Sequence, residues 1–328
     1  MAARVDVRKT YKLYIGGKFP RSESGRSYEV YAAPTRAGAS PKFLANASQG
    51  SRKDARDAVT AARGAQAGWA GATAYNRGQV LYRVAEVMEG RRAQFVEEVR
   101  ASEGVSPSKA DSLVSQAIDR WVWYAGWSDK LPQVLGGLNP VAGPFFNISA
   151  PEPSGVVAVL APQESSLLGL VSVIAPAIVT GNSVVVVSSK ERPLPAITLS
   201  ECLATSDVPG GVVNIVTGDA VEIAPWLASH RDVNGIDLTG AAGLQGEAWG
   251  EWERAAADTL KRVIRPGGAG AAAIEPDWAI AELPHLLARK HFDPHWSRAQ
   301  GQVLASEQIS LFGLVLAPKK PVHYGRIA

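Results

Sequence analysis

The only thiol in the 328-residue chain belongs to Cys202, within the stretch LSECLATSDVPGG. A cysteine acts as a nucleophile through its thiolate, which forms readily only where a neighbouring group lowers the pKa. No histidine lies near Cys202 in the sequence, and small or apolar neighbours alternate with Glu201 and Thr205. This pattern is typical of a helix that packs on a core, so we expect Cys202 to be buried and structural.

Four serines could supply a hydroxyl nucleophile, and all of them follow predicted strands: Ser165, Ser166, Ser188 and Ser189. The nucleophilic serine of α/β-hydrolases stands in a Gly-x-Ser-x-Gly turn that exposes its hydroxyl. No such motif surrounds any of the four. We therefore assign none of them a catalytic role.

A metal site is suggested only by His291 and His295, which stand four residues apart with Asp293 between them. Two histidines at this spacing share one face of a helix and can bind a metal together. Pro294 argues against a helix there, and no third ligand is evident. We therefore predict no metal site.

Composition limits the classes of function. The net charge of +3 is spread along the chain without a long basic run, which argues against a dedicated nucleic-acid surface. A single cysteine excludes an internal disulfide and fits a reducing cytosol. The stretch MAARVDVRKTYK lacks the apolar core of a signal peptide, and no apolar stretch is long enough to span a bilayer. We expect a cytoplasmic protein with no membrane partner.

Residues 1–150 are predicted to form a hairpin followed by helices. Alternating residues around a Gly-Gly pair indicate a β-hairpin over 11–19. Ser51 and Asp54 have the spacing of a helix cap and its reciprocal partner. Amphipathic spacing predicts two more helices, at 76–101 and 107–128, of which the second has a buried aromatic face in WVWYAGW.

Residues 151–273 have a different pattern. Apolar, β-branched runs alternate with helical stretches, and the runs are GVVAVLAP, GNSVVVVSS, GGVVNIV and VNGIDLTG. Strands that are apolar on both faces indicate a parallel sheet covered on both sides. Right-handed crossovers then give a Rossmann-type, doubly wound α/β fold.

Several segments resemble aldehyde dehydrogenases in the same order along the chain. YKLYIGGKFPRSESGRSYEV and RKDARDAVTAARGAQAGW are similar to their N-terminal part, and PEPSGVVAVLAP, APAIVTGNSVVVV, DVPGGVVNIVTGD and SHRDVNGIDLTG to their cofactor domain. The resemblance covers about residues 10–268. It implies a cofactor domain, a catalytic domain and an oligomerisation hairpin. It also implies aldehyde oxidation with NAD or NADP, through a cysteine nucleophile and a glutamate that activates water.

Two functional positions of that family are altered near the first two strands of the cofactor domain. After the first strand, Glu164 stands where the family has the asparagine whose amide donates to the developing oxyanion. Loss of one such donor costs roughly 3–4 kcal/mol of barrier. After the second strand the family has Lys-Pro-Ser-Glu, whose lysine and glutamate hold the adenosine ribose. This chain has Val187-Ser188-Ser189-Lys190 instead, which puts ribose recognition in doubt.

Further departures concern the turn near the cofactor's pyrophosphate, the catalytic base and the nucleophilic cysteine. Leu238-Thr239-Gly240-Ala241 replaces the family's Phe-Thr-Gly-Ser, so the tight turn is kept and the serine is lost. Backbone N–H groups at such a turn can still bind an anion. Arg265 stands at the position of the catalytic glutamate and cannot act as a base. The family's nucleophile follows the Gly-Gly pair, whereas Cys202 precedes Gly267-Gly268.

Residues 274–328 resemble a different family, bacterial DEAH-box RNA helicases, in a segment that leads into their C-terminal β-barrel. The resemblance rests on Ile274-Glu275-Pro276-x-Trp278, Pro294-His295-Trp296 and Leu311-Phe312-Gly313-Leu314. The chain has no phosphate-binding G-x-x-x-x-G-K-[S/T] loop. We expect a helix over 278–290, short strands that end at Lys319-Lys320-Pro321, and a loosely attached tail that proteases cut near 268–300.

These departures favour a catalytically degenerate family member that acts as a partner or scaffold subunit, and the expected partner is a complete aldehyde dehydrogenase subunit. NAD or NADP would then bind weakly or not at all. Two alternatives stay open: an active NAD(P)-dependent oxidoreductase that acts on aldehydes, and a protein that associates with RNA through its tail. We assign no catalytic residue. The candidate cofactor-binding residues, chosen by position alone, are Gln163, Glu164, Ser188, Lys190, Thr239 and Gly240.

Overall fold

A computed structural model describes residues 8–34, 40–135, 137–138, 145–242, 248–266 and 316–326. At its centre lies a five-stranded sheet with the order β10-β9-β6-β7-β8, in which every pair is parallel. The predicted parallel, doubly wound α/β sheet is confirmed. Its strands are β6 (Val156–Leu160), β7 (Ser183–Val187), β8 (Val213–Val216), β9 (Gly235–Asp237) and β10 (Arg262–Ile264).

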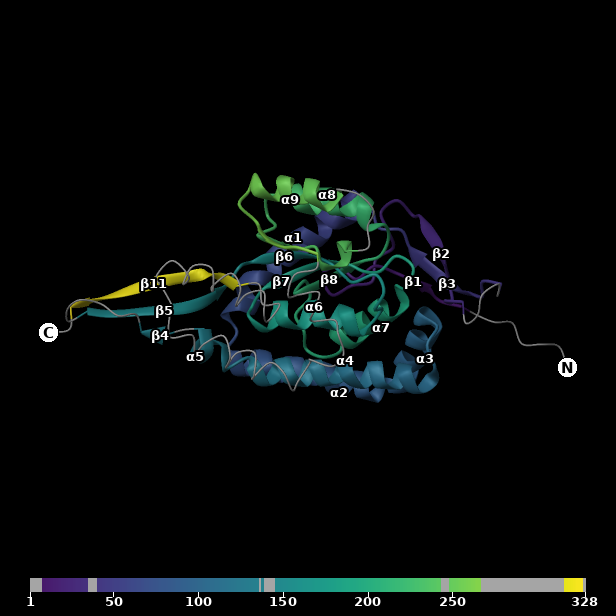
Figure 1. Cartoon of the computed structure of the whole chain (residues 1–328), viewed down its shortest axis with the longest axis horizontal. Helices are drawn as coiled ribbons and strands as arrows, with labels where there is room; N and C mark the ends of the chain where they lie inside the picture. Colours follow the sequence, from purple (N-terminus) through teal and green to yellow (C-terminus); the bar gives the residue numbers. More distant parts are fainter. Residues whose placement is uncertain are drawn as a thin grey trace.

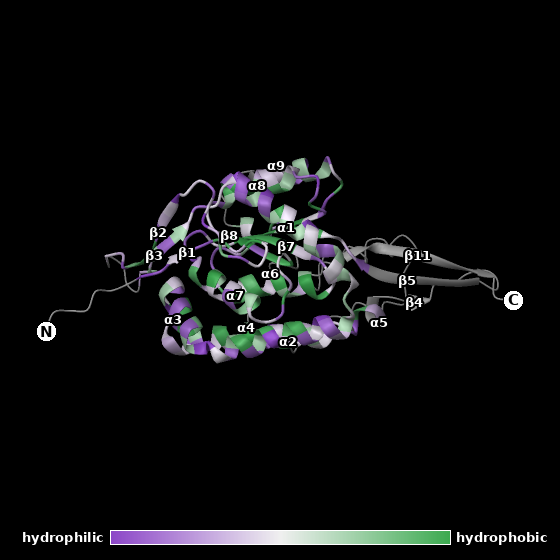
Figure 2. Ribbon diagram, turned by 180° about the vertical axis from the view of Figure 1, so that it is seen from behind, coloured by the Kyte–Doolittle hydropathy of each residue, from purple (hydrophilic) through white to green (hydrophobic). Residues whose placement is uncertain are grey.

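Helices cover both faces of this sheet, as Figure 1 shows. One layer contains α1 (Arg52–Gly71), α8 (Ala220–Ser229) and α9 (Ala248–Ala257), and the other contains α6 (Leu168–Val179) and α7 (Leu194–Ala204). The strands are apolar on both sides because each face meets a layer of helices. Figure 2 shows the hydrophobic residues gathered in these central elements. No helix in the described part of the chain is long and apolar enough to cross a membrane.

Helix α1 begins at the capping pair that the sequence predicted. The Ser51 side chain accepts a hydrogen bond from the backbone N–H of Asp54, and the Asp54 carboxylate accepts one from the backbone N–H of Ser51 at 2.8 Å. Asp54 also accepts hydrogen bonds from Ser22 Oγ at 2.8 Å and from the backbone N–H of Glu23 at 3.0 Å. The cap therefore also anchors the preceding loop.

The predicted single helix over 76–101 is wrong, because two helices occupy this region. Helix α2 (Ala74–Gly90) ends before Arg91, and α3 (Arg92–Glu103) follows in a new direction. Glycine favours a helix end, and Arg91 leaves the helical conformation with φ −113° and ψ 14°. The turn lets α3 pack on α7, where Arg91 pairs with Glu201.

Helix α4 (Pro107–Trp127) packs between α2 and α6. Its aromatic stretch lies against the core, with Trp121 fully buried and Trp123 and Trp127 partly buried. The predicted buried aromatic face is confirmed.

The predicted hairpin over 11–19 is present, and it belongs to a larger N-terminal unit. The backbones of Ile15 and Lys18 exchange hydrogen bonds across the turn, which Gly16 and Gly17 form with φ values of 61° and 77°. A sheet with the order β1-β3-β2 lies beside it and was not predicted from the sequence. Its strands are β1 (Thr10–Tyr11), β2 (Ser27–Tyr31) and β3 (Phe43–Ser48).

A third sheet projects from the end of the molecule opposite the N-terminus (Figure 1). It follows the short helix α5 (Leu131–Leu135) and has the order β11-β5-β4. Strand β11 (Leu316–Arg326) pairs antiparallel with β5 (Phe145–Pro153), and β4 (Gly137–Leu138) lies on the other side of β5.

The expected end of the last strand at Lys319–Pro321 is wrong, because β11 continues through these residues to Arg326. A register shift between Ala317 and Lys320 accommodates this segment. The predicted helix over 278–290 lies outside the described residues. The resemblance of residues 274–328 to a helicase segment stays a prediction.

A buried carboxylate, Glu98, joins the N-terminal sheet to two helices. Its Oε1 accepts hydrogen bonds from Tyr11 at 3.0 Å, Gln94 at 3.1 Å and Thr198 at 2.8 Å. Its Oε2 is buried and has no hydrogen-bond partner among the described residues. Burial raises the pKa of Glu98, and the three hydrogen bonds offset this only in part.

The Glu98→Gln variant tests this buried charge. Folding raises the pKa of Glu98. The stability that its protonated side chain contributes is therefore complete at pH values below the pKa of an unfolded glutamate, and it is lost as the pH rises through the pKa of the folded state. Urea unfolding from pH 4 to pH 7 should show wild-type stability falling relative to Glu98→Gln. Glu97→Gln is the matched control, because Arg100 lowers the pKa of Glu97 and its effect has the opposite sign. Parallel pH profiles for wild type and Glu98→Gln would contradict this account.

Candidate functional site

All six candidate positions lie in loops at the carboxyl edge of the five-stranded sheet. Strand β6 lies between β9 and β7, and the chain passes from β6 to β7 and β8 before it returns to β9 on the other side. Such a reversal of strand order leaves a crevice at the carboxyl ends, where doubly wound proteins bind ligands. The segments 161–167, 188–193 and 238–241 form this edge.

Gly240 brings the segment after β9 onto the end of β6. It lies in the short 3-10 helix η1 (Thr239–Ala241), where the backbone N–H of Thr239 donates to Asp237 at 2.8 Å. A Cβ at Gly240 would stand 2.1 Å from the carbonyl oxygen of Ala161. The tight turn that the sequence indicated is therefore present, and only glycine fits it.

Gln163 connects the loops that follow β6 and β7. Its Nε2 donates to the Ala161 carbonyl at 2.8 Å, and its Oε1 accepts from the backbone N–H of Lys190 at 3.2 Å. Ser189 Oγ donates to the Gln163 carbonyl at 2.9 Å. Since Gly240 approaches the same Ala161 carbonyl, one network joins Gln163, Lys190 and the turn after β9.

Lys190 is held by Asp219, which the sequence analysis missed. The Lys190 Nζ lies 2.7 Å from Asp219 Oδ2, and Asp219 Oδ1 caps α8 by accepting from the backbone N–H of Val221 at 2.9 Å. The hydrogen bond to Asp219 raises the pKa of Lys190. Partial burial raises the pKa of Asp219, but hydrogen bonds from Lys190 and the helix N-terminus outweigh it and lower the pKa. A sequence signal existed, because an aspartate three residues before Glu222 is typical of a helix start.

Glu164 points away from the site. Its side chain is 89 % exposed, and its Oε2 lies 3.0 Å from Nη2 of Arg192. The Arg192 guanidinium also donates to the backbone carbonyl of Glu164. No sequence pattern marked Arg192 as this partner.

Two buried hydroxyls lie at this edge of the sheet. Ser188 follows β7 and is 1 % exposed, and Thr239 follows β9 and is 3 % exposed. Ser188 Oγ has no hydrogen-bond partner among the described residues. Burial raises the pKa of the neighbouring Asp237 carboxyl, and a hydrogen bond from the Thr239 side chain opposes this rise.

The other candidate nucleophiles are held inside the structure. Cys202 lies in α7 with 0 % exposure, so its predicted position in a buried helix is confirmed. Burial raises the pKa of its thiol to about 11, although Arg91 opposes the shift. Ser166 Oγ donates to Glu103 at 2.7 Å, and Ser165 Oγ accepts from the backbone N–H of Gly169 at 2.9 Å.

Arg265, which the resemblance is expected to align with the family's catalytic glutamate, forms an ion pair. The Arg265 Nε lies 2.8 Å from Glu253 Oε1 on α9. In the described part of the chain, no three His, Cys, Asp or Glu side chains are grouped as a metal site requires. His291, Asp293 and His295 lie outside the described residues.

A family model described as "Aldehyde dehydrogenase family" matches residues 24–283. The chain belongs to the aldehyde dehydrogenase family. The match runs past residue 268, which the sequence resemblance was expected to reach, and into the segment from 274 onward.

Relatives of known name cover most of this chain. D-glyceraldehyde dehydrogenase (NADP(+)) of Thermoplasma acidophilum is 27 % identical over 298 residues, which are 90 % of this chain and 57 % of the relative. Cytosolic aldehyde dehydrogenase 1 of Elephantulus edwardii is 29 % identical over 301 residues, again 90 % of this chain and 57 % of the relative. Omega-crystallin of Enteroctopus dofleini is 30 % identical over 71 % of this chain and 46 % of its own length.

Solved structures of the family share the fold. The NAD+ complex of aldehyde dehydrogenase from Bacillus cereus superposes with a TM-score of 0.72 at 26 % identity, over 80 % of this chain and 52 % of that one. NAD-dependent aldehyde dehydrogenase from Sinorhizobium meliloti gives 0.72 at 25 % identity, over 80 % and 51 %. This aldehyde dehydrogenase family chain therefore spans about half the length of the relatives it matches.

Gly240→Ala tests the contact between η1 and the end of β6. The added Cβ would meet backbone atoms of Ala161, so we expect a loss of about 1–3 kcal/mol in unfolding free energy. Gly250→Ala is the matched control, because its Cβ would meet nothing within 4 Å in helix α9 and should stabilise by about 0.5–1 kcal/mol. Urea unfolding measures both variants, and equal stabilities would contradict the close approach.

Proposed function

We propose that this chain is an aldehyde-dehydrogenase-fold subunit that does not oxidise aldehydes itself and acts as a partner or scaffold for a complete family member. The observation that carries the proposal is the state of Cys202, the only cysteine in the chain, which is fully buried in α7. An aldehyde cannot reach a thiol in that position. A thiol whose pKa is raised to about 11 also stays protonated near pH 7, and the protonated form is a poor nucleophile.

The altered loop positions support the same proposal. Where the family has an oxyanion donor, the Glu164 carboxylate is turned to solvent and paired with Arg192. Where it has a base, Arg265 is paired with Glu253. The Glu164 carboxylate cannot donate a hydrogen bond to an oxyanion, and the Arg265 guanidinium cannot accept a proton from water.

A dinucleotide fits this site only in part. The N–H of Gly240 is the one backbone donor in η1 without an acceptor among the described residues, so it is the group left for a phosphate. Lys190 and Asp219 supply a donor and an acceptor for a ribose, but they already bond each other. These residues would hold NAD or NADP weakly, and a bound nicotinamide would supply a hydride acceptor.

An active NAD(P)-dependent oxidoreductase is the second candidate, because relatives of this chain are named as dehydrogenases and one solved neighbour is an NAD+ complex. This candidate needs a nucleophile that the described residues do not present. RNA association through the tail and a cytoplasmic location stay predictions from the sequence.

Aldehyde turnover separates the two candidates. We expect no reduced nicotinamide when the protein is mixed with NAD or NADP and a panel of aliphatic and aromatic aldehydes. Iodoacetamide should label Cys202 in urea but not in the native protein, because the folded thiol is buried. Aldehyde oxidation that is lost in Cys202→Ser would contradict the proposal.

Calorimetry with NAD and NADP tests cofactor binding on the full chain. We expect dissociation constants no tighter than about 1 mM, because the ribose partners are held in the Lys190–Asp219 pair. Asp219→Asn releases Lys190 and should tighten NADP, with its additional phosphate, more than NAD. Micromolar binding of NAD to the wild type would favour the active oxidoreductase.

A further inference from the structure

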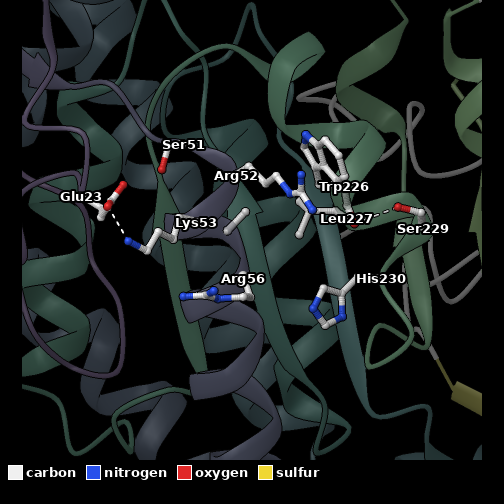
Figure 3. Close-up of a pocket in the computed structure, with 10 residues that line it drawn as sticks. Glu23, Ser51, Arg52, Lys53, Arg56, Trp226, Leu227, Ser229 and His230 are labelled. Atoms are coloured by element: carbon white, nitrogen blue, oxygen red, sulfur yellow. Dashed lines mark hydrogen bonds and ion pairs between the residues drawn. The ribbon is translucent and has the colours of Figure 1, made fainter.

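A second concave site lies between the start of α1 and the end of α8, away from the carboxyl-edge loops. It has a volume of about 650 Å³. Figure 3 shows residues of α1 on one side of it and residues 226–230 on the other. The site shares no lining residue with the six candidate cofactor positions. Its principal polar and aromatic lining residues are Glu23, Arg52, Lys53, Arg56, Trp226 and His230.

The lining is rich in positive charge. Arg52, Lys53 and Arg56 stand within five consecutive residues, and Glu23 is the one carboxylate among the residues that line the site. Glu23 is paired with Lys53, as the dashed line in Figure 3 marks. Arg56 is paired with its neighbour Asp57 at 2.8 Å, with both side chains more than half exposed. Exposed pairs of this kind are weak and exchange readily for a stronger anion.

Arg52 has no such partner. Its guanidinium lies over the ring of Trp226, 3.5 Å from the centroid, and no carboxylate or carbonyl pairs with it among the described residues. The ring holds the planar guanidinium in place while its N–H groups stay available at the edge. A guanidinium fixed in this way is suited to a bidentate contact with an anion.

Backbone and histidine donors add to these cations. The N–H groups of Arg52 and Lys53 are the first two of α1, and they have no acceptor among the described residues, because the capping box uses the N–H groups of Ser51 and Asp54. His230 Nδ1 accepts from the backbone N–H of Asp232 at 3.2 Å. Neutral His230 therefore carries its proton on Nε2, as a further donor.

We propose that this site binds the phosphate group of a small phosphorylated molecule. A phosphate dianion accepts more hydrogen bonds and carries more negative charge than a single carboxylate. A site with several donors and three cations therefore suits a phosphate better. Arg52 and Arg56 supply guanidinium forks, and the N-terminus of the 20-residue α1 adds its dipole. Glu23, the one acidic lining residue, is paired with Lys53, so the three cations leave the lining with a net charge of +2.

Titration calorimetry with inorganic pyrophosphate tests the site on the full chain at about 0.15 M ionic strength. We expect binding of one pyrophosphate per chain, weakened about tenfold in Arg52→Gln and in Arg56→Gln. Both side chains are exposed, so neither change should alter folding, and circular dichroism with thermal unfolding checks this. Arg83→Gln is the matched control, because Arg83 is an exposed arginine on α2 whose ion-pair partners in the described part of the chain are Glu86 and Asp207.

Two further arms separate this site from other sources of binding. Citrate in place of pyrophosphate should bind at least tenfold more weakly if the site is selective for phosphate. Lys190→Gln should leave pyrophosphate binding unchanged, because Lys190 belongs to the carboxyl-edge site. The proposal fails if pyrophosphate does not bind, if citrate binds as tightly, or if Arg83→Gln or Lys190→Gln weakens binding as much as Arg52→Gln.

Discussion

Alternate side chains of strand β6 enter two different cores, and the other elements depend on this two-sided burial. Val157 and Val159 pack with α6 and α7, whereas Val156, Ala158 and Leu160 pack with α1 and α8. A strand that is apolar on both faces needs helices on both, and parallel pairing makes every strand end at the same edge. The packing of the helices on the sheet therefore stabilises the fold, and the sequences of the loops at that edge can change without loss of this packing.

The layers were predictable from the sequence because local patterns determine them. Continuous β-branched runs specified the buried parallel strands, and the Ser51–Asp54 spacing specified the start of α1. The break at Arg91 was not predictable, since the apolar periodicity continues across it and only packing of α3 on α7 decides the turn. The pairing of β11 with β5 joins residues far apart in the sequence, and no local pattern encodes such a contact.

The positions of the site residues could be predicted from the sequence, but the hydrogen bonds and ion pairs between them could not. The strand ends located Gln163, Lys190 and Gly240 at one edge, and the hydrogen bonds to Gln163 and the approach of Gly240 to Ala161 join them. The ion pairs at this edge could not be derived from the sequence, because Asp219, the partner of Lys190, lies in another loop. Sequence spacing alone does not report such tertiary distances.

Three charged residues that the sequence resemblance aligns with functional positions of the family each have a partner of opposite sign. Lys190 pairs with Asp219, Glu164 with Arg192, and Arg265 with Glu253, at N–O distances of 2.7, 3.0 and 2.8 Å. Exposed pairs add little stability, so stability alone does not explain why they accompany every replacement. Their common effect is to neutralise a charge at the carboxyl edge of the sheet. The charged groups of these loops therefore interact with one another, and the sheet and helices below them keep the arrangement of the family.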